Sequence, residues 1–306
     1  MQKKLSAFLA VLFVITTLAA CAPSQDHGET TATTVETTVE TTAETTAETT
    51  VETTVEPTVE ATEEPTQETT RGPSNDVTTQ TPVSPAPAGS HAIAGSVPES
   101  AAVSSSYFDD AVFVGDSISL KLSYYEAAAD KLGGAQFLTS GSLGSGNALW
   151  EVSSKSVHPT FQNQKMRLED SVPLTGAKKL YIMLGMNDIA VYGVDGAVAN
   201  LSTLIKNIQA KVPDMKVYIQ SMTPTTDTSN ITSSGGINRG SIQRYNEALS
   251  SACQANGWHF VNVAEVMYDS NGYLIRAYCS DPDGMGIHFT ETGCRAWIDY
   301  LYTHTA

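Results

Sequence analysis

The sequence predicts an α/β fold in which helices cover both faces of a central parallel sheet. Two observations support this prediction. Short apolar runs alternate with amphipathic segments along residues 96–306, which is typical of strand–helix–strand units. Polar motifs also follow two of the apolar runs directly, as expected where ligand sites lie beyond the carboxyl ends of parallel strands. The pattern does not give the order of the strands.

Each element has a local reason. Strands are predicted where apolar residues run continuously, as in buried parallel strands: 111–115, 136–139, 179–184, 215–220 and 258–262. Helices are predicted where apolar residues recur on one face: 117–130, 195–211, 237–256 and 291–302. Asp195 opens the second helix, Gly257 ends the third, and Thr290 opens the last, all favourable residues for those positions.

The first 20 residues predict a lipoprotein signal peptide. Lys3 and Lys4 provide a positive start, and residues 5–20 form an apolar stretch of the length of a signal-peptide core. Small residues then precede Cys21, as in a bacterial lipoprotein processing site, so we expect Cys21 to be lipidated. The alternative is a simple secretory signal. The first interpretation implies an exported protein, lipid-anchored to the outer face of the bacterial cytoplasmic membrane or the cell surface.

Residues 21–95 predict a disordered stalk rich in Thr, Glu and Pro. Between Glu36 and Glu60, glutamate recurs at every fourth position, but threonine is a poor helix former and few large apolar groups are present. Residues 22–95 hold 13 acidic residues and one arginine, and thus most of the net charge of −16. We therefore expect an extended, self-repelling chain.

The remaining residues, 96–306, are long enough for one domain with a sizeable core. This part is only mildly acidic and has no basic patch suited to nucleic acid. No cysteine or histidine spacing indicates a metal site, and no cofactor is expected. Cys253, Cys279 and Cys294 are interpreted as buried thiols; the alternative is a Cys279–Cys294 disulfide in an exported protein.

A Gly-Asp-Ser motif at 115–117 follows the first predicted strand and opens a helix. The N-terminus of a helix offers unpaired backbone N–H groups and a positive dipole end. Ser117 would therefore have its own N–H beside whatever its hydroxyl attacks, which is the geometry of an oxyanion hole. The alternative is that Ser117 only caps the helix.

Two further segments offer hydrogen-bond donors. Asn187, in the Gly-Met-Asn-Asp motif at 185–188, carries an amide NH₂ at the end of another strand, while Asp188 is interpreted as structural. Gly144 lies in a glycine-rich loop at 139–146, where the backbone can approach a ligand closely. The alternative for this loop is a flexible glycine-rich surface segment.

His288 is the candidate general base. It lies in a loop just before the final helix, and imidazole is the usual proton acceptor for a neutral serine nucleophile.

These motifs, in this order and at these separations, resemble the SGNH/GDSL hydrolase family over roughly residues 107–304. The resemblance implies a three-layer α/β/α sandwich of flavodoxin-like type with esterase, lipase or carbohydrate-deacetylase activity. It further implies that Ser117 is the nucleophile and that His288 is the base. Gly144 and Asn187, with the Ser117 N–H, would be the oxyanion donors.

The sequence departs from the family pattern at two places. Ile118 replaces the leucine of the first motif, which is a modest apolar exchange. Met285 stands where the family has an aspartate, three residues before the histidine. Asp283 is favoured as the residue that orients His288, with Asp281 as the second candidate. A Ser–His dyad, with a backbone carbonyl orienting the ring, is the remaining possibility.

The sequence thus predicts an extracytoplasmic serine esterase that acts on small acyl esters, with O-acetyl groups of carbohydrate or cell-wall glycan favoured. This substrate preference follows from the predicted location and from the resemblance. The expected partners of the protein are an acylated glycan or small ester and, through the lipid anchor, a membrane. Two alternatives are a catalytically silent glycan-binding domain, favoured by Met285, and an O-acyltransferase.

Overall fold

The computed structural model describes residues 91–234 and 236–306. The predicted signal peptide, the lipidation site Cys21 and nearly all of the stalk lie outside the described residues. Within the two described ranges, no helix is both long and apolar enough to cross a membrane.

A parallel five-stranded sheet forms the centre of the domain, with the strand order β2-β1-β5-β6-β7. Its strands are β1 (Ala111–Gly115), β2 (Gln136–Thr139), β5 (Lys179–Met183), β6 (Lys216–Gln220) and β7 (His259–Val261). The helices are α1 (Ser117–Ala129), α2 (Leu168–Leu174), α3 (Ile189–Lys211), α4 (Arg239–Asn256) and α5 (Glu291–Thr303). A two-stranded antiparallel hairpin consists of β3 (Thr160–Phe161) and β4 (Gln164–Lys165).

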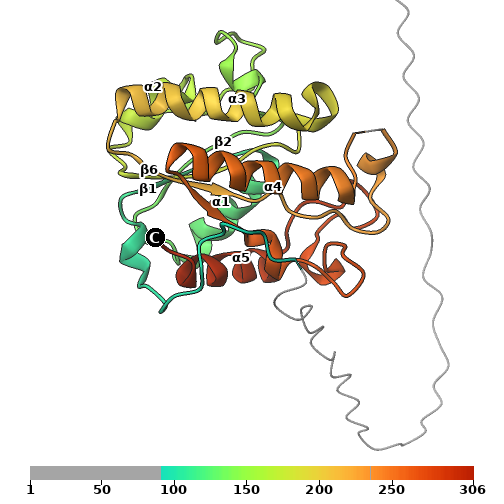
Figure 1. The fold of residues 1–306 in the computed structure, drawn as a ribbon. Helices are drawn as coiled ribbons and strands as arrows, with labels where there is room; N and C mark the ends of the chain where they lie inside the picture. Colours follow the sequence, from blue (N-terminus) through green and yellow to red (C-terminus); the bar gives the residue numbers. More distant parts are fainter. Residues whose placement is uncertain (1–90, 235) are drawn as a thin grey trace, which may run out of the picture. The chain divides into compact units, whose positions relative to one another are not determined.

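The helices form a layer on each face of the sheet. In Figure 1, α3 and α4 lie on one side of the sheet and α5 lies on the other. α3 also contacts α2 and α4, and α1 contacts α5. The predicted three-layer α/β/α architecture is therefore confirmed.

One ring from each strand stacks across the sheet. The ladder runs from β2 to β7 with neighbouring ring centroids 5.2, 4.8, 4.5 and 5.0 Å apart, through Phe137, Phe113, Tyr181, Tyr218 and His259. All four neighbouring pairs are also paired in the strand register. Because a slip of one residue would move a strand's rings to the opposite face, this ladder favours a single register.

The predicted strands are all present, with ends that differ by at most one residue. The second predicted helix begins earlier than expected, at Ile189, and its first turn is separated by a break at Gly193, where φ is +68°. The sequence analysis did not predict α2 or the β3–β4 hairpin. α2 has only seven residues and contains Pro173, so its apolar spacing is too short to indicate a helix.

The domain extends slightly beyond its predicted boundary. The sequence assigns residues 91–95 to the stalk, whereas His91 stacks on Tyr268 with ring centroids 3.8 Å apart. Ser250 Oγ also donates a hydrogen bond to Ala94 O at 2.6 Å. Cys253, Cys279 and Cys294 are buried free thiols, so the alternative of a Cys279–Cys294 disulfide is wrong.

Candidate active site

Two of the sequence motifs meet where the order of strands reverses. β1 continues through α1 to β2 on one side, whereas β5 lies on the other side of β1 and leads towards β6 and β7. Ser117 follows β1, and Asn187 follows β5, its hydrogen-bonded neighbour. In open α/β sheets, ligands bind at such a switch point beyond the carboxyl ends of the strands.

Three side chains from distant parts of the chain form a hydrogen-bonded series at this place. Ser117 Oγ lies 3.0 Å from His288 Nε2, and His288 Nδ1 lies 2.7 Å from Asp281 Oδ2. Because an ionised carboxylate can only accept, Nδ1 donates to Asp281 and Nε2 of the neutral ring accepts from the Ser117 hydroxyl. An imidazole in this position can take the proton of a serine that attacks a carbonyl carbon.

Asp281, not Asp283, contacts His288, so the favoured assignment of Asp283 is wrong. The Asp283 side chain is 73% exposed and forms an ion pair with Arg276 at 2.8 Å. It also accepts a hydrogen bond from Thr228 Oγ1 at 2.9 Å. These partners hold Asp283 at the surface, while Asp281, the second candidate, contacts Nδ1 of the imidazole.

Asp281 is also fixed by its own loop. Its Oδ1 atom accepts hydrogen bonds from the backbone N–H groups of Ile287 and His288 and from the Cys279 thiol, at 3.1–3.2 Å. Partial burial raises the pKa of Asp281, but the hydrogen bonds from the His288 ring, Cys279 and the backbone outweigh it, so the pKa is lowered overall. Asp281 is thus held in its ionised form, as an acceptor for His288.

The segment at 226–230 supports the lengthened loop between Asp281 and His288. Thr226 N donates to Gly286 O at 3.0 Å, and Asn230 N donates to Gly284 O at 2.9 Å. A Cβ atom at Gly286 would lie 2.1 Å from Thr226 Oγ1, and the φ of Gly286 is +68°. The close approach of the two segments therefore requires glycine at this position.

Asp116 caps α1 and leaves Ser117 as the first residue of the helix. Asp116 Oδ1 accepts from Ile118 N at 2.9 Å, so the interpretation of Ser117 as the cap is wrong. Burial raises the pKa of Asp116 to about 7, the backbone hydrogen bond from Ile118 opposes the rise, and the nearby Asp188 carboxyl adds to it. A buried carboxyl group with a raised pKa therefore immediately precedes Ser117 in the chain and contacts Asn187.

Gly144 and Asn187, the two expected oxyanion donors, have acceptors within the protein. Gly144 N donates to Asn147 Oδ1 at 2.8 Å. Asn187 Nδ2 donates to Leu143 O at 3.1 Å and to Asp116 Oδ2 at 3.3 Å. The structure thus brings the glycine-rich loop against Asn187, and both donors are hydrogen-bonded within the protein.

Asp188 holds the glycine-rich loop in place. Its Oδ2 atom accepts from Ser145 N at 2.8 Å, and its Oδ1 atom accepts from Gly146 N at 2.9 Å. A Cβ atom on Gly144 would lie 2.8–3.0 Å from this carboxyl group. The structural interpretation of Asp188 is confirmed, and the same contact explains why position 144 is a glycine.

Sequence reasoning missed two residues that contact this site. Asn147 Oδ1 accepts from the N–H of Gly144, and the Cys279 thiol donates to Asp281. No periodicity or motif identifies them, because each acts on a neighbour that only the folded loops bring into reach. The one available signal is the position of Asn147 three residues after Gly144, the spacing at which a side chain can reach back to a backbone N–H.

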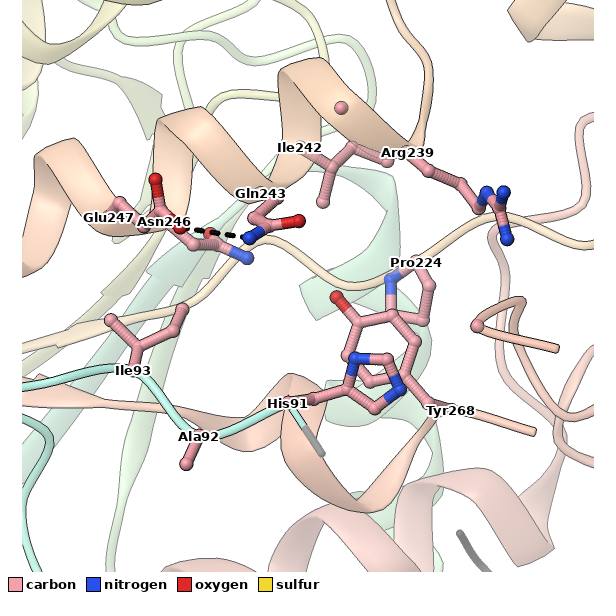
Figure 2. A pocket seen from close by; sticks show the side chains of 12 residues that line it. His91, Ala92, Ile93, Pro224, Arg239, Ile242, Gln243, Asn246, Glu247 and Tyr268 are labelled. Atoms are coloured by element: carbon pink, nitrogen blue, oxygen red, sulfur yellow. Dashed lines mark hydrogen bonds between the residues drawn. The ribbon is translucent and has the colours of Figure 1, made fainter. Parts of the chain in front are cut away.

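A separate cavity of about 380 Å³ lies elsewhere on the domain. It is formed between α4 and the chain that enters the domain, and Figure 2 shows its lining residues, among them His91, Arg239, Gln243, Glu247 and Tyr268. None of the predicted catalytic residues lines it. The candidate active site is therefore assigned by its hydrogen-bonded residues and not by this cavity.

Comparison with known proteins places the chain in a family. The family model described as GDSL-like Lipase/Acylhydrolase matches residues 113–296. Two solved structures have similar folds, each at 20% identity and a TM-score of 0.50: a GDSL-like lipase from Bacteroides thetaiotaomicron, and a candidate acylhydrolase from Bacteroides fragilis. The first match covers 63% of this chain and 86% of the other, and the second covers 67% and 88%.

A search of curated proteins found no match. The family match covers more than half of the sequence and includes Ser117, Gly144, Asn187 and His288. This chain belongs to the GDSL-like lipase/acylhydrolase family.

Proposed function

We propose that this protein is an extracytoplasmic serine esterase that removes small acyl groups, in particular O-acetyl groups from carbohydrate or cell-wall glycan. The observation that carries the proposal is the hydrogen-bonded series Ser117–His288–Asp281, at 3.0 and 2.7 Å. Two N–H donors belong to neighbouring residues: Asn187, which contacts Asp116 and Leu143, and Gly144, which follows Leu143. Family membership supports the general class of acyl-ester hydrolysis.

In the first half of the reaction, Ser117 Oγ attacks the ester carbonyl carbon while its proton passes to His288 Nε2. Asp281 stabilises the imidazolium that forms. The oxyanion is stabilised by the N–H groups of Ser117 and Gly144 and by the amide of Asn187. The Asn187 N–H that contacts Asp116 Oδ2 can be shared with the oxyanion, because that hydrogen bond is long, at 3.3 Å. The C–O bond then breaks, and the alcohol leaves with the proton from His288.

The second half repeats these steps with water. His288 takes a proton from a water molecule, whose oxygen attacks the acyl carbon bound to Ser117 Oγ. The new tetrahedral intermediate uses the same oxyanion donors. When it collapses, the bond to Ser117 Oγ breaks, the proton returns to Ser117, and the carboxylic acid is released.

The choice of a glycan substrate rests on two features. The predicted lipid anchor and stalk would hold the domain near the polymers of the cell surface. In addition, Trp150 is 58% exposed and lies four residues beyond the end of the glycine-rich loop, three residues after Asn147. An exposed indole offers a flat, amphipathic face on which a sugar ring can pack.

The alternative of a silent glycan-binding domain has lost its main support. The argument for it is that Met285 stands at the usual place of the acid, but Asp281 Oδ2 lies 2.7 Å from His288 Nδ1 and can act as the acid instead. Transfer of the acyl group to a sugar hydroxyl would use the same Ser117 intermediate and differ only in the acceptor. Analysis of products with a glycan present separates transfer from hydrolysis.

The decisive experiment compares Ser117→Ala with Ser123→Ala on p-nitrophenyl acetate and on acetylated oligosaccharides. Ser123 lies on the same helix, and its hydroxyl donates to the backbone oxygen of Leu120 at 2.8 Å. We expect turnover to disappear in Ser117→Ala and to persist in Ser123→Ala. Equal activity in Ser117→Ala and the unmodified protein, or no activity of the unmodified protein on any of these esters, would overturn the proposal.

A further inference from the structure

The side chain of Asn147 forms a two-point clasp within the glycine-rich loop. Its Oδ1 atom accepts from Gly144 N at 2.8 Å, and its Nδ2 atom donates to Ser142 O at 2.9 Å. Gly144 N is the donor that the proposed function assigns to the oxyanion. A side-chain carbonyl of this protein therefore bonds to the N–H that the proposed function assigns to the oxyanion.

Asn147 differs from the acceptors that face Asn187. Those acceptors are a backbone carbonyl at the buried Leu143 and the carboxyl group of the buried Asp116, and both belong to the fixed frame of the fold. The Asn147 side chain is only half-buried and can leave by rotation about its own side-chain bonds. Of these acceptors, Asn147 is the one that can move without a change of the backbone.

The backbone beside the clasp is in an unusual conformation. Ser142, whose carbonyl accepts from Asn147, has a φ of +61°, in the left-handed region. Non-glycine residues in this region persist where the surrounding structure holds them, and they are frequent at ligand clamps and switches. The Asn147 amide is one of the groups that hold Ser142 in place.

We propose that Asn147 is a positioning residue that occupies the Gly144 donor in the free enzyme and yields it to the oxyanion as the tetrahedral intermediate forms. The inference rests on the proposed function. A neutral substrate carbonyl forms a hydrogen bond no stronger than that of the Asn147 amide, so it does not displace the side chain. A charged oxyanion forms hydrogen bonds about twice as strong and does displace it.

This exchange makes the Gly144 hydrogen bond selective for the transition state. Interactions that are stronger in the transition state than in the ground state accelerate the chemical step. Without the Asn147 carbonyl, Gly144 N–H would also bind the ground-state carbonyl. Removal of the side-chain acceptor should therefore lower KM more than it raises kcat.

The test measures kcat and KM for p-nitrophenyl acetate in Asn147→Ala, Asn147→Leu and Asn147→Asp. Ala and Leu remove the acceptor, and Leu retains most of the volume. For both we expect kcat/KM to rise about fivefold, the factor that corresponds to one neutral hydrogen bond of ~1 kcal/mol. Asp retains the acceptor but adds a negative charge beside the oxyanion, so kcat/KM should fall on the order of tenfold or more.

A second measurement does not depend on turnover. Phenylboronic acid forms a negatively charged tetrahedral adduct with a serine hydroxyl, so its inhibition constant reports how well the oxyanion is bound. We expect tighter inhibition in Asn147→Ala and weaker inhibition in Asn147→Asp. Asn163→Asp, in the exposed turn between β3 and β4, introduces the same charge change outside the site and should change neither value.

The outcomes separate this inference from the proposed function. If Asn147→Ala, Asn147→Leu and Asn147→Asp all lose activity, Asn147 only supports the loop and the inference is wrong. The proposed function still stands in that case, provided that Ser117→Ala is inactive. Unchanged kinetics in all three variants would overturn it in the same way. If the unmodified protein has no esterase activity, the proposed function fails first and this inference fails with it.

Discussion

His288 and Asp281 lie seven positions apart in the sequence, yet Nδ1 of His288 lies 2.7 Å from Asp281 Oδ2. The loop between them turns back so that Gly284 N and Gly286 N both donate to Asp281 O, at 2.9 and 3.0 Å. This turn accommodates the longer separation between Asp281 and His288 in the sequence, so that the two side chains remain in contact. A lengthened loop can therefore supply the acid from an unusual position in the sequence.

The role of this pair can be tested with two matched substitutions. Asp281→Asn should lower kcat by about 10⁴, because the amide no longer stabilises the imidazolium or the required tautomer. Asp283→Asn, two residues away, removes one partner of an exposed ion pair with Arg276. Because exposed ion pairs contribute only about 0–1 kcal/mol to stability, kcat should change less than about threefold. Steady-state kinetics on p-nitrophenyl acetate measure both. A larger loss in Asp283→Asn would reverse the assignment.

Asn187→Ala should lower kcat on the order of 10²–10³, the usual cost of removing one oxyanion donor. The fold should remain intact, since Asp188 still holds the glycine-rich loop through Ser145 and Gly146. Activity and the melting temperature, measured on the same preparation, separate the two effects. Full activity in this variant would show that Asn187 is not an oxyanion donor.

Two glycines in one loop provide a matched pair for stability. In Gly144→Ala the new methyl group would lie 2.8–3.0 Å from the Asp188 carboxyl, whereas Gly141→Ala meets no atom within 4 Å. We expect Gly144→Ala to lower the free energy of unfolding by about 1–3 kcal/mol and to impair activity, since overpacking carries a cost of this size. Gly141→Ala should be close to neutral in urea unfolding. Similar losses in both would mean that the loop tolerates no side chain for other reasons.

Stability should depend on pH through Asp116. Its pKa rises from 3.8 to about 7 in the folded protein, so between these values the folded state holds a proton that the unfolded state has lost. The stabilising contribution of the protonated group is therefore present below pH 3.8 and is lost as the pH rises towards 7.

Asp116→Asn should remove this dependence. Between pH 5 and pH 8, we expect the free energy of unfolding of the unmodified protein to fall by roughly 2–3 kcal/mol more than that of the variant. Urea unfolding at the two pH values gives both differences. Parallel changes in the two proteins would show that Asp116 does not titrate in this range.

Trp150 offers a test of the substrate class. Trp150→Ala should raise KM for an acetylated oligosaccharide by about five- to tenfold, since a lost aromatic contact is worth about 1 kcal/mol or more. It should leave KM for p-nitrophenyl acetate nearly unchanged, because that ester has no sugar ring. Equal effects on the two substrates would indicate a general distortion of the adjacent loop and would count against a glycan substrate.

Much of the fold was determined by local sequence pattern. Continuous apolar runs such as 111–115 and 179–184 indicated buried strands, and the motifs after them indicated the edge of the sheet at which the site lies. These features could be predicted because strand burial and helix amphipathicity leave a short-range signal. The sequence alone thus determined the α/β class, the five strands, and Ser117 and His288 as candidates for one site.

Only the tertiary structure decided that Asp281, and not Asp283, contacts His288. Only it showed that Asn147 accepts a hydrogen bond from Gly144 N. Both carboxyl groups lie in the same loop and have the same chemistry, so no spacing rule separates them. Arg276, seven residues before Asp283 in the sequence, forms an ion pair that holds Asp283 at the surface, and it also donates to the hydroxyl of the more distant Thr228. The turn of the chain brings Asp281 to Nδ1 of the imidazole. Such choices depend on which distant groups the folded chain brings within hydrogen-bond distance, and a linear pattern does not record those distances.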